Sequence, residues 1–158
     1  MGEILGENRL LFLGMNKRQR IASYALIVFQ GHVLLTQHGR GPNKGRWGLP
    51  GGGIEYGENP IDSLEREVFE EAGIVATHYV LDDVISSIIQ IELNDDHPEE
   101  LHNVGLLYRA QVASLLTVKP DADGHSSLGS RWFKVAELHE SDVSPPIRGY
   151  LRKNHILK

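Results

Sequence analysis

The sequence of 158 residues contains no cysteine, which excludes disulfide frameworks, zinc–thiolate sites and thiol nucleophiles. Long apolar runs are also absent. Near the N-terminus the longest run, Leu10 to Leu13, is too short for a signal peptide, and no later run approaches the roughly 20 residues of a membrane span. We therefore expect a soluble, cytoplasmic protein that has no membrane partner.

The sequence has no general excess of positive charge, because its formal net charge is -5. A protein with this charge lacks the cations that displace counterions from a nucleic acid, so we expect no nucleic-acid partner. A small anionic substrate needs local neutralisation, which favours a divalent metal ion. A phosphate-binding P-loop is excluded, because the segment Gly39 to Lys44 lacks the Gly-Lys-Ser/Thr ending and no helical pattern follows it.

Strand-like segments precede and follow one clear helix. The helix is predicted from the N-cap Asn59, Pro60 at its first position and Gly73 as its C-cap. Strands on both sides of a helix predict an α/β protein, an α/β/α sandwich with a mixed sheet. The predicted strands are 21–29, 33–36 (after a turn at Gly31), 84–93, 104–112 and 131–135, with loops at 39–53, 94–100 and 119–130 and a C-terminal helix at 146–153.

Three carboxylates share one face of the predicted helix, because Glu67, Glu70 and Glu71 stand at i, i+3 and i+4. Like charges at this spacing destabilise a helix, and Arg66 is the only cation nearby. A hard cation such as Mg²⁺ prefers oxygen ligands of this kind. A run of glycines, 51–53, directly precedes this segment and lets the backbone approach a ligand closely. Backbone and side-chain ligands are thus predicted to meet at one point.

The segment from Gly52 to Ile74 resembles the Nudix box of the Nudix hydrolases. The box is a glycine, five residues, a glutamate, seven residues, and then Arg-Glu-apolar-any-Glu-Glu-any-Gly-apolar. The match has no gap and no substitution, and it consists of Gly52, Glu58, Arg66, Glu67, Val68, Glu70, Glu71, Gly73 and Ile74.

The resemblance implies a single Nudix domain over residues 1–158, with residues 1–20 as an N-terminal extension. It also implies a Mg²⁺-dependent pyrophosphohydrolase, with Mn²⁺ as an alternative ion. Glu70 and Glu71 would ligate the metal, the backbone carbonyl of Gly51 would be a further ligand, and Glu58 would add to the site. A metal held in this way polarises a phosphoryl oxygen and lowers the pKa of bound water.

The resemblance leaves the role of Glu67 and the identity of one further carboxylate open. Glu67 would be a metal ligand or the base that activates water, and Arg66 would orient a glutamate. Family members recruit another carboxylate from a loop before the last strand, and this loop contains no glutamate. The candidates for that carboxylate are Asp121, Asp123, Glu99 and Glu100.

Further residues are weaker candidates. Arg40, Lys44 and Arg46 precede the glycines and either meet substrate phosphates or are solvated. We predict that Trp47 packs in the core, and that Lys17, Arg18 and Arg20 form an exposed cluster without a function.

The substrate is predicted to be a small nucleotide: a nucleoside triphosphate, an oxidised nucleotide, or a nucleotide sugar of the ADP-ribose type. The alternative function is a Nudix-like module that senses a nucleotide without cleaving it. From the family, a homodimer is a further expectation, with the segment 9–13 as an additional strand that pairs with a second subunit.

Overall fold

The computed structural model describes residues 16–92, 98–121 and 127–158. The expected pairing segment 9–13 and the candidate Asp123 lie outside these residues. The elements are β1 Asn16–Phe29, β2 His32–His38, β3 Trp47–Gly48, β4 Gly51–Gly53, α2 Pro60–Ala72, β5 Thr77–Glu92, β6 Pro98–Gln111, β7 Ser127–Lys134, the 3-10 helices Val135–Glu137, Glu140–Asp142 and Pro145–Ile147, and α3 Arg148–Lys153.

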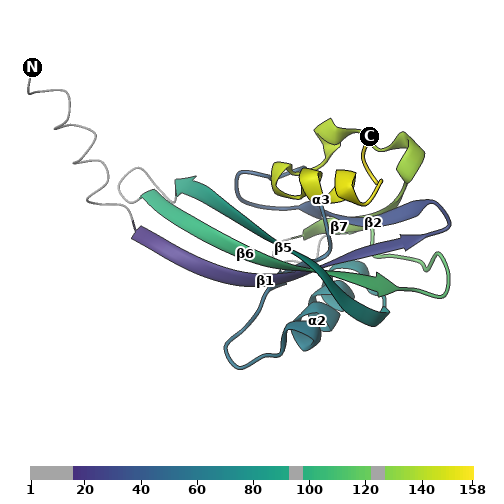
Figure 1. The fold of residues 1–158 in the computed structure, drawn as a ribbon, viewed down its shortest axis with the longest axis horizontal. Helices are drawn as coiled ribbons and strands as arrows, with labels where there is room; N and C mark the ends of the chain where they lie inside the picture. Colours follow the sequence, from purple (N-terminus) through teal and green to yellow (C-terminus); the bar gives the residue numbers. More distant parts are fainter. Residues whose placement is uncertain (1–15, 93–97, 122–126) are drawn as a thin grey trace, which may run out of the picture.

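The sheet is mixed, as predicted. Its strands follow the order β3-β2-β1-β6-β5, with β4 paired to β1 and β7 paired to β2. The pairing of β1 with β6 is parallel and the other pairings are antiparallel. Helix α2 lies on one side of the sheet and α3 on the other (Figure 1). Each helix covers its own buried apolar cluster, so the α/β/α sandwich is confirmed.

Helix α2 begins and ends where the sequence predicts. The Asn59 side chain accepts a hydrogen bond from the Ile61 N–H at 3.0 Å, and Pro60 occupies the first turn. Gly73 adopts the left-handed conformation (φ 70°), and its N–H donates to the Phe69 carbonyl. Leu64 is fully buried, as are Val68 and Ala72, so this face of the helix packs on the sheet.

Four strands begin well before their predicted starts, because they are longer than their apolar segments; β5 begins at Thr77 rather than at residue 84. β1 begins at Asn16 rather than at residue 21, and β6 begins at Pro98 in a segment predicted as loop. Their parallel pairing sets basic residues of β1 beside acidic residues of β6: Lys17 lies 3.7 Å from Glu100, and Arg18 pairs with Glu99. Cross-strand ion pairs thus extend both strands beyond their apolar parts. β7 begins at Ser127 rather than at residue 131.

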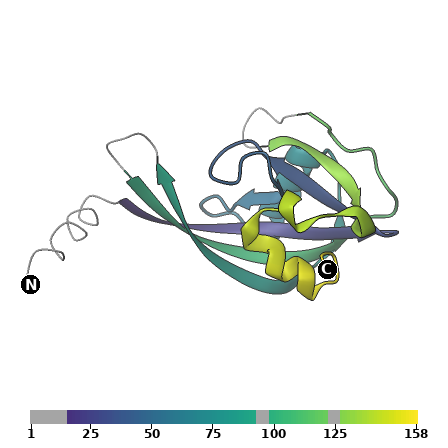
Figure 2. The ribbon, with the colours of Figure 1, turned by 90° about the horizontal axis from the view of Figure 1, so that it is seen from above.

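The extended parts of three strands form a projection, which we call the ribbon: residues 16–20 of β1, 86–91 of β5 and 99–103 of β6. The ribbon extends beyond the body that the two helices cover (Figures 1 and 2). Residues 16–20, expected within an N-terminal extension, belong to this part of the sheet. None of the helices in the described ranges is long and apolar enough to cross a membrane.

Candidate active site

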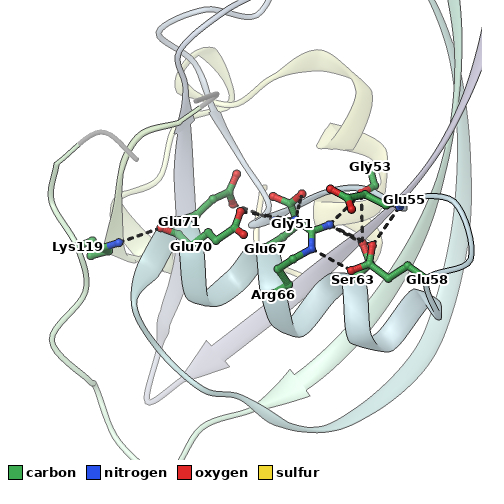
Figure 3. A network of polar contacts seen from close by, with 10 residues as sticks. All are labelled: Gly51, Gly53, Glu55, Glu58, Ser63, Arg66, Glu67, Glu70, Glu71 and Lys119. Atoms are coloured by element: carbon green, nitrogen blue, oxygen red, sulfur yellow. Dashed lines mark hydrogen bonds and ion pairs between the residues drawn. The ribbon is translucent and has the colours of Figure 1, made fainter. Parts of the chain in front are cut away.

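Two carboxylates of the helix face, Glu67 and Glu70, and Glu58 of the preceding loop lie around one arginine (Figure 3). Arg66 donates to both oxygens of Glu58, from Nε at 2.9 Å and from Nη2 at 3.1 Å. Its Nη1 donates to Oε1 of Glu67 at 3.0 Å and lies 3.6 Å from Oε2 of Glu70. A bidentate guanidinium–carboxylate pair fixes the orientation of both groups. Arg66 therefore holds three glutamates in defined positions.

Glu71 faces the glycine loop. Its carboxylate is buried and accepts a hydrogen bond from the Gly51 N–H at 3.0 Å. Gly51 has φ 137°, and a Cβ at this position would lie 2.1 Å from the Ser23 carbonyl oxygen. Only glycine therefore fits between α2 and β1 at this point.

Gly52 makes room for a second carboxylate. A Cβ on this residue would lie 2.5–2.7 Å from the carboxylate atoms of Glu67. The absence of a side chain lets Glu67 lie directly against the loop backbone. The C-terminal end of α2 is held by Lys119, which donates from Nζ to the Glu70 carbonyl at 3.2 Å. The glycine loop therefore lies against α2 at Glu67 and Glu71.

The environment shifts the pKa values of two carboxyl groups in opposite directions. The hydrogen bonds from Arg66 lower the pKa of Glu58 to about 2. Burial raises the pKa of Glu67, although Arg66 opposes that shift. Glu58 is thus ionised at any pH above its shifted value, while Glu67 takes up a proton more readily than an ordinary glutamate.

The donor atoms fit a hard divalent cation. Glu67, Glu70 and Glu71 supply carboxylate oxygens within one turn of α2, and Gly52 leaves space beside one of them. Within the described ranges no three acidic or histidine side chains already converge on one point. The Glu58 and Glu67 carboxylates are instead hydrogen-bonded to Arg66 (Figure 3).

The carboxylates open onto a cavity of about 800 Å³. Gly51, Gly52, Glu67 and Glu71 form one end of its lining, which we call the carboxylate end. The other end lies against the ribbon. The ribbon residues and their neighbours in the lining are Arg18, Arg20, Tyr24, Ile85, Ser87, Ile89, Ile91, Glu99, Leu101 and Asn103.

The weaker candidates separate in the structure. Arg40 lines the cavity, whereas Lys44 and Arg46 do not. Arg46 instead donates to the Ser141 carbonyl at 2.9 Å, which anchors the loop. Trp47 packs edge-on against Phe133 with ring centroids 4.7 Å apart, so its predicted packing role is confirmed.

The four candidate carboxylates also lie in different places. Glu99 lines the cavity and is buried, and it lies on β6 rather than on a loop. Glu100 pairs with Lys17, and Asp121 is exposed. Asp123 lies outside the described residues.

Two arginines of the cavity wall were missed by sequence reasoning. Arg18 and Arg20 were predicted to be an exposed cluster without a function; they are exposed, as predicted, and both also line the cavity. Their signal is the alternation of a strand, since Arg18, Arg20, Ala22 and Tyr24 occupy every second position of β1. Because the predicted strand began only at residue 21, it did not include Arg18 and Arg20, and the alternation was not recognised.

The comparisons with known proteins agree with this arrangement. The NUDIX domain family model matches residues 17–153. A Mycobacterium tuberculosis protein, provisionally named 8-oxo-dGTP diphosphatase 2, is 33% identical over 120 residues, which are 75% of this chain and 76% of the relative. The nucleoside triphosphatase NudI of Salmonella agona is 33% identical over 148 residues, which are 89% and 99% of the two chains.

A solved structure matches as well. The MutT NUDIX hydrolase from Burkholderia pseudomallei has a TM-score of 0.65 and 28% identity to this chain. The match covers 85% of this chain and 97% of that structure.

Proposed function

Since the chain belongs to the Nudix family of hydrolases, which act on phosphoanhydride bonds, we propose that it hydrolyses a nucleoside triphosphate with a divalent metal ion. One observation carries the proposal: the glycine loop, Glu67 and Glu71 lie at one end of a cavity whose wall also holds Arg20 and Arg40. Carboxylates that hold a cation and guanidinium groups that pair with phosphates are the recurring parts of phosphoryl-transfer sites.

Nudix hydrolases generally use a divalent metal, and we propose Mg²⁺, with Mn²⁺ as the alternative. Glu67, Glu70 and Glu71 would hold the ion, with Glu58 and the Gly51 carbonyl as further ligands. When bound, such an ion polarises a phosphoryl oxygen and lowers the pKa of a bound water molecule.

The chain's own residues position the reactants. Arg66 keeps the Glu67 carboxylate in place through its hydrogen bond to Oε1. Glu67 would then either complete the ligand set of the ion or accept the proton of the attacking water. The water oxygen forms a bond to phosphorus, and the bridging oxygen leaves with the electron pair of the broken anhydride bond. Arg20 and Arg40 bind phosphate oxygens along the wall.

A nucleoside triphosphate is favoured over the other nucleotides because both relatives described above carry names of triphosphate-cleaving enzymes. Oxidised nucleotides belong to the same class, and nucleotide sugars of the ADP-ribose type are the alternative substrates. A cytoplasmic location and a homodimer stay predictions. The segment 9–13, expected to pair the two subunits, lies outside the described residues.

The experiment that tests this proposal is phosphate, pyrophosphate and nucleoside monophosphate release from a panel of nucleoside triphosphates, nucleotide sugars and ADP-ribose. Each substrate is assayed with Mg²⁺, with Mn²⁺ and with EDTA. Turnover is expected for triphosphates only, and only with a metal ion. Glu70→Gln should lower kcat at least about 100-fold.

The matched control is Glu65→Gln, which removes a charge from an exposed position on the opposite side of the same helix. It should leave kcat unchanged. Metal-independent turnover, or equal activity of the two variants, would contradict the metal site. Tight nucleotide binding without turnover on the whole panel would instead indicate a sensing module.

A further inference from the structure

One polar side chain of the cavity has an unused hydrogen-bonding atom. Asn103 lies on β6 within the ribbon, is only 7% exposed and lines the cavity. Its Oδ1 atom is buried and has no hydrogen-bond partner among the described residues. Buried acceptors are nearly always paired in folded proteins, so an unpaired one that lines a cavity points to a donor that arrives with a ligand.

The Asn103 side chain lies close to Tyr24. Burial raises the pKa of the Tyr24 hydroxyl, and the Arg20 guanidinium and a hydrogen bond from the Asn103 side chain act in the opposite direction. The Asn103 amide thus lies within reach of the Tyr24 hydroxyl, while its Oδ1 atom has no partner among the described residues. Gly105 permits this contact, because a Cβ there would lie 3.1 Å from the Tyr24 ring.

The strand register defines the surroundings of Asn103. Arg20 of β1 and Ser87 of β5 are its direct neighbours in the sheet, so the three side chains form one row on the cavity face. The rows on either side are apolar on β5, with Ile85 and Ile89. An apolar lining with a few placed polar groups is typical of a small-molecule site, in which the polar groups fix the orientation of the ligand.

We infer that Asn103 determines nucleobase preference, with its Oδ1 atom accepting a hydrogen bond from an N–H donor on the edge of the substrate's base. The inference rests on the proposed nucleotide substrate. Phosphates are excluded as the partner of Oδ1, because their oxygens only accept hydrogen bonds at neutral pH. The cationic group of Arg20 lies beside Gly53 at the carboxylate end, so base and phosphates would bind on opposite sides of this arginine.

The test is equilibrium binding of nucleoside monophosphates without added metal, which needs no turnover. Each pair of ligands differs in one donor: GMP and IMP, AMP and purine riboside monophosphate, CMP and its 4-deamino analogue, UMP and its N3-methyl analogue. A further pair, GMP and dGMP, differs in a ribose hydroxyl group. The proteins are the wild type, Asn103→Leu, Asn103→Asp and the control Gln19→Leu, which makes the same type of change on the neighbouring strand at a residue outside the cavity.

The wild type should bind the donor-bearing base of at least one pair about 10-fold more tightly than its analogue. Asn103→Leu should reduce that ratio to about 1, whereas Asn103→Asp and Gln19→Leu should keep it. A merely structural role for Asn103 would lower the affinities for both members of a pair and leave their ratio intact. Thermal unfolding of each variant separates a loss of fold from a loss of preference.

The inference would be overturned if, for every two ligands that differ in a base donor, the wild type bound both with nearly equal affinity. A preference that survives in Asn103→Leu would also overturn it, as would a loss of the GMP–dGMP ratio instead of a base ratio, which would place a ribose hydroxyl at Oδ1. Failure of the proposed hydrolysis is a separate result, because it is measured by product release with metal. A base preference that depends on Asn103 in a protein without turnover would sustain this inference and contradict only the reaction.

Discussion

The two ends of the cavity are built in different ways. The carboxylate end comes from one continuous stretch, residues 51–71, in which a glycine loop leads directly into a capped helix. The ribbon end comes from three strands that are far apart in the sequence, and strand register alone brings Arg20, Ser87 and Asn103 into one row. By our proposals, the first end holds the groups that the reaction requires, and the second holds groups that distinguish one substrate from another.

Because the two ends are built differently, we expect substitutions at each end to affect different properties of the protein. At the carboxylate end the side chains are coupled through Arg66 and through backbone atoms of the loop. A change there should affect fold and catalysis together. At the ribbon end each side chain lies on an extended strand, and a change should affect substrate affinity without affecting the fold.

The largest effect is expected from Gly51→Ala. The new Cβ would lie 2.1 Å from the Ser23 carbonyl oxygen, and φ 137° is unfavourable for any residue with a side chain. Moving the loop away would break the hydrogen bond from Gly51 to Glu71. We expect a loss of about 3 kcal/mol or more in the free energy of unfolding, measured by urea denaturation, together with loss of turnover.

The control for this prediction is Gly149→Ala in α3. No atom lies within 4 Å of a Cβ at that position. The replacement should be neutral or stabilise the protein by up to about 1 kcal/mol, because alanine favours a helix. If Gly51→Ala were as stable as the wild type, the loop would be able to move away from β1 at little cost, which would contradict the prediction.

The same contrast explains what could be predicted from the sequence. Helix α2 and its carboxylates were predicted in detail, because caps at Asn59 and Gly73 and the spacing of the glutamates are local signals. The β1 and β6 parts of the ribbon were not predicted, since these strands are extended by pairing between Arg18 and Glu99 and between Lys17 and Glu100, whereas the β5 part lies within the predicted strand 84–93. Such pairs have no local signature, and charged residues outside apolar runs were assigned to loops.

Asn103 illustrates a further limit of the sequence. It stands in a predicted loop-to-strand boundary, and nothing near it in the sequence marks it as special. Its importance comes from burial and from an unpaired oxygen atom, which are properties of the folded chain.

A medium effect is expected from Arg20→Met. Unlike Arg18, Arg20 has no ion pair in the part of the chain that the structure describes, so its charge is available to substrate phosphates. Its removal should raise KM for a nucleoside triphosphate about 10-fold and change kcat by less than about 3-fold, because binding is weakened equally in the ground and transition states. Steady-state kinetics across a range of substrate concentrations would measure both constants.

Lys17→Met is the matched control for Arg20→Met. It removes one positive charge from the same strand, but Lys17 does not line the cavity and pairs with Glu100. Its KM should equal that of the wild type. If both variants raise KM alike, the effect reflects the overall charge of the protein rather than a contact with the substrate.

The smallest effect concerns the contribution of Glu58 to stability as the pH is lowered. The hydrogen bonds from Arg66 lower the pKa of Glu58 from 4.5 to about 2 in the folded protein. A carboxyl group whose pKa is lower in the folded than in the unfolded state stabilises the fold above its unfolded value, and the contribution disappears as the pH falls toward the folded value. Wild type should therefore unfold at a higher urea concentration than Glu58→Gln above about pH 5, and the difference between the two midpoints should shrink toward zero near pH 2.

Asp62→Asn, in the first turn of the same helix, serves as the comparison for a general loss of helix charge. A midpoint difference for Glu58→Gln that does not change between pH 5 and pH 2 would mean that the charge of Glu58 contributes nothing through Arg66, and the carboxylate end would then depend on its glycines rather than on its ion pairs.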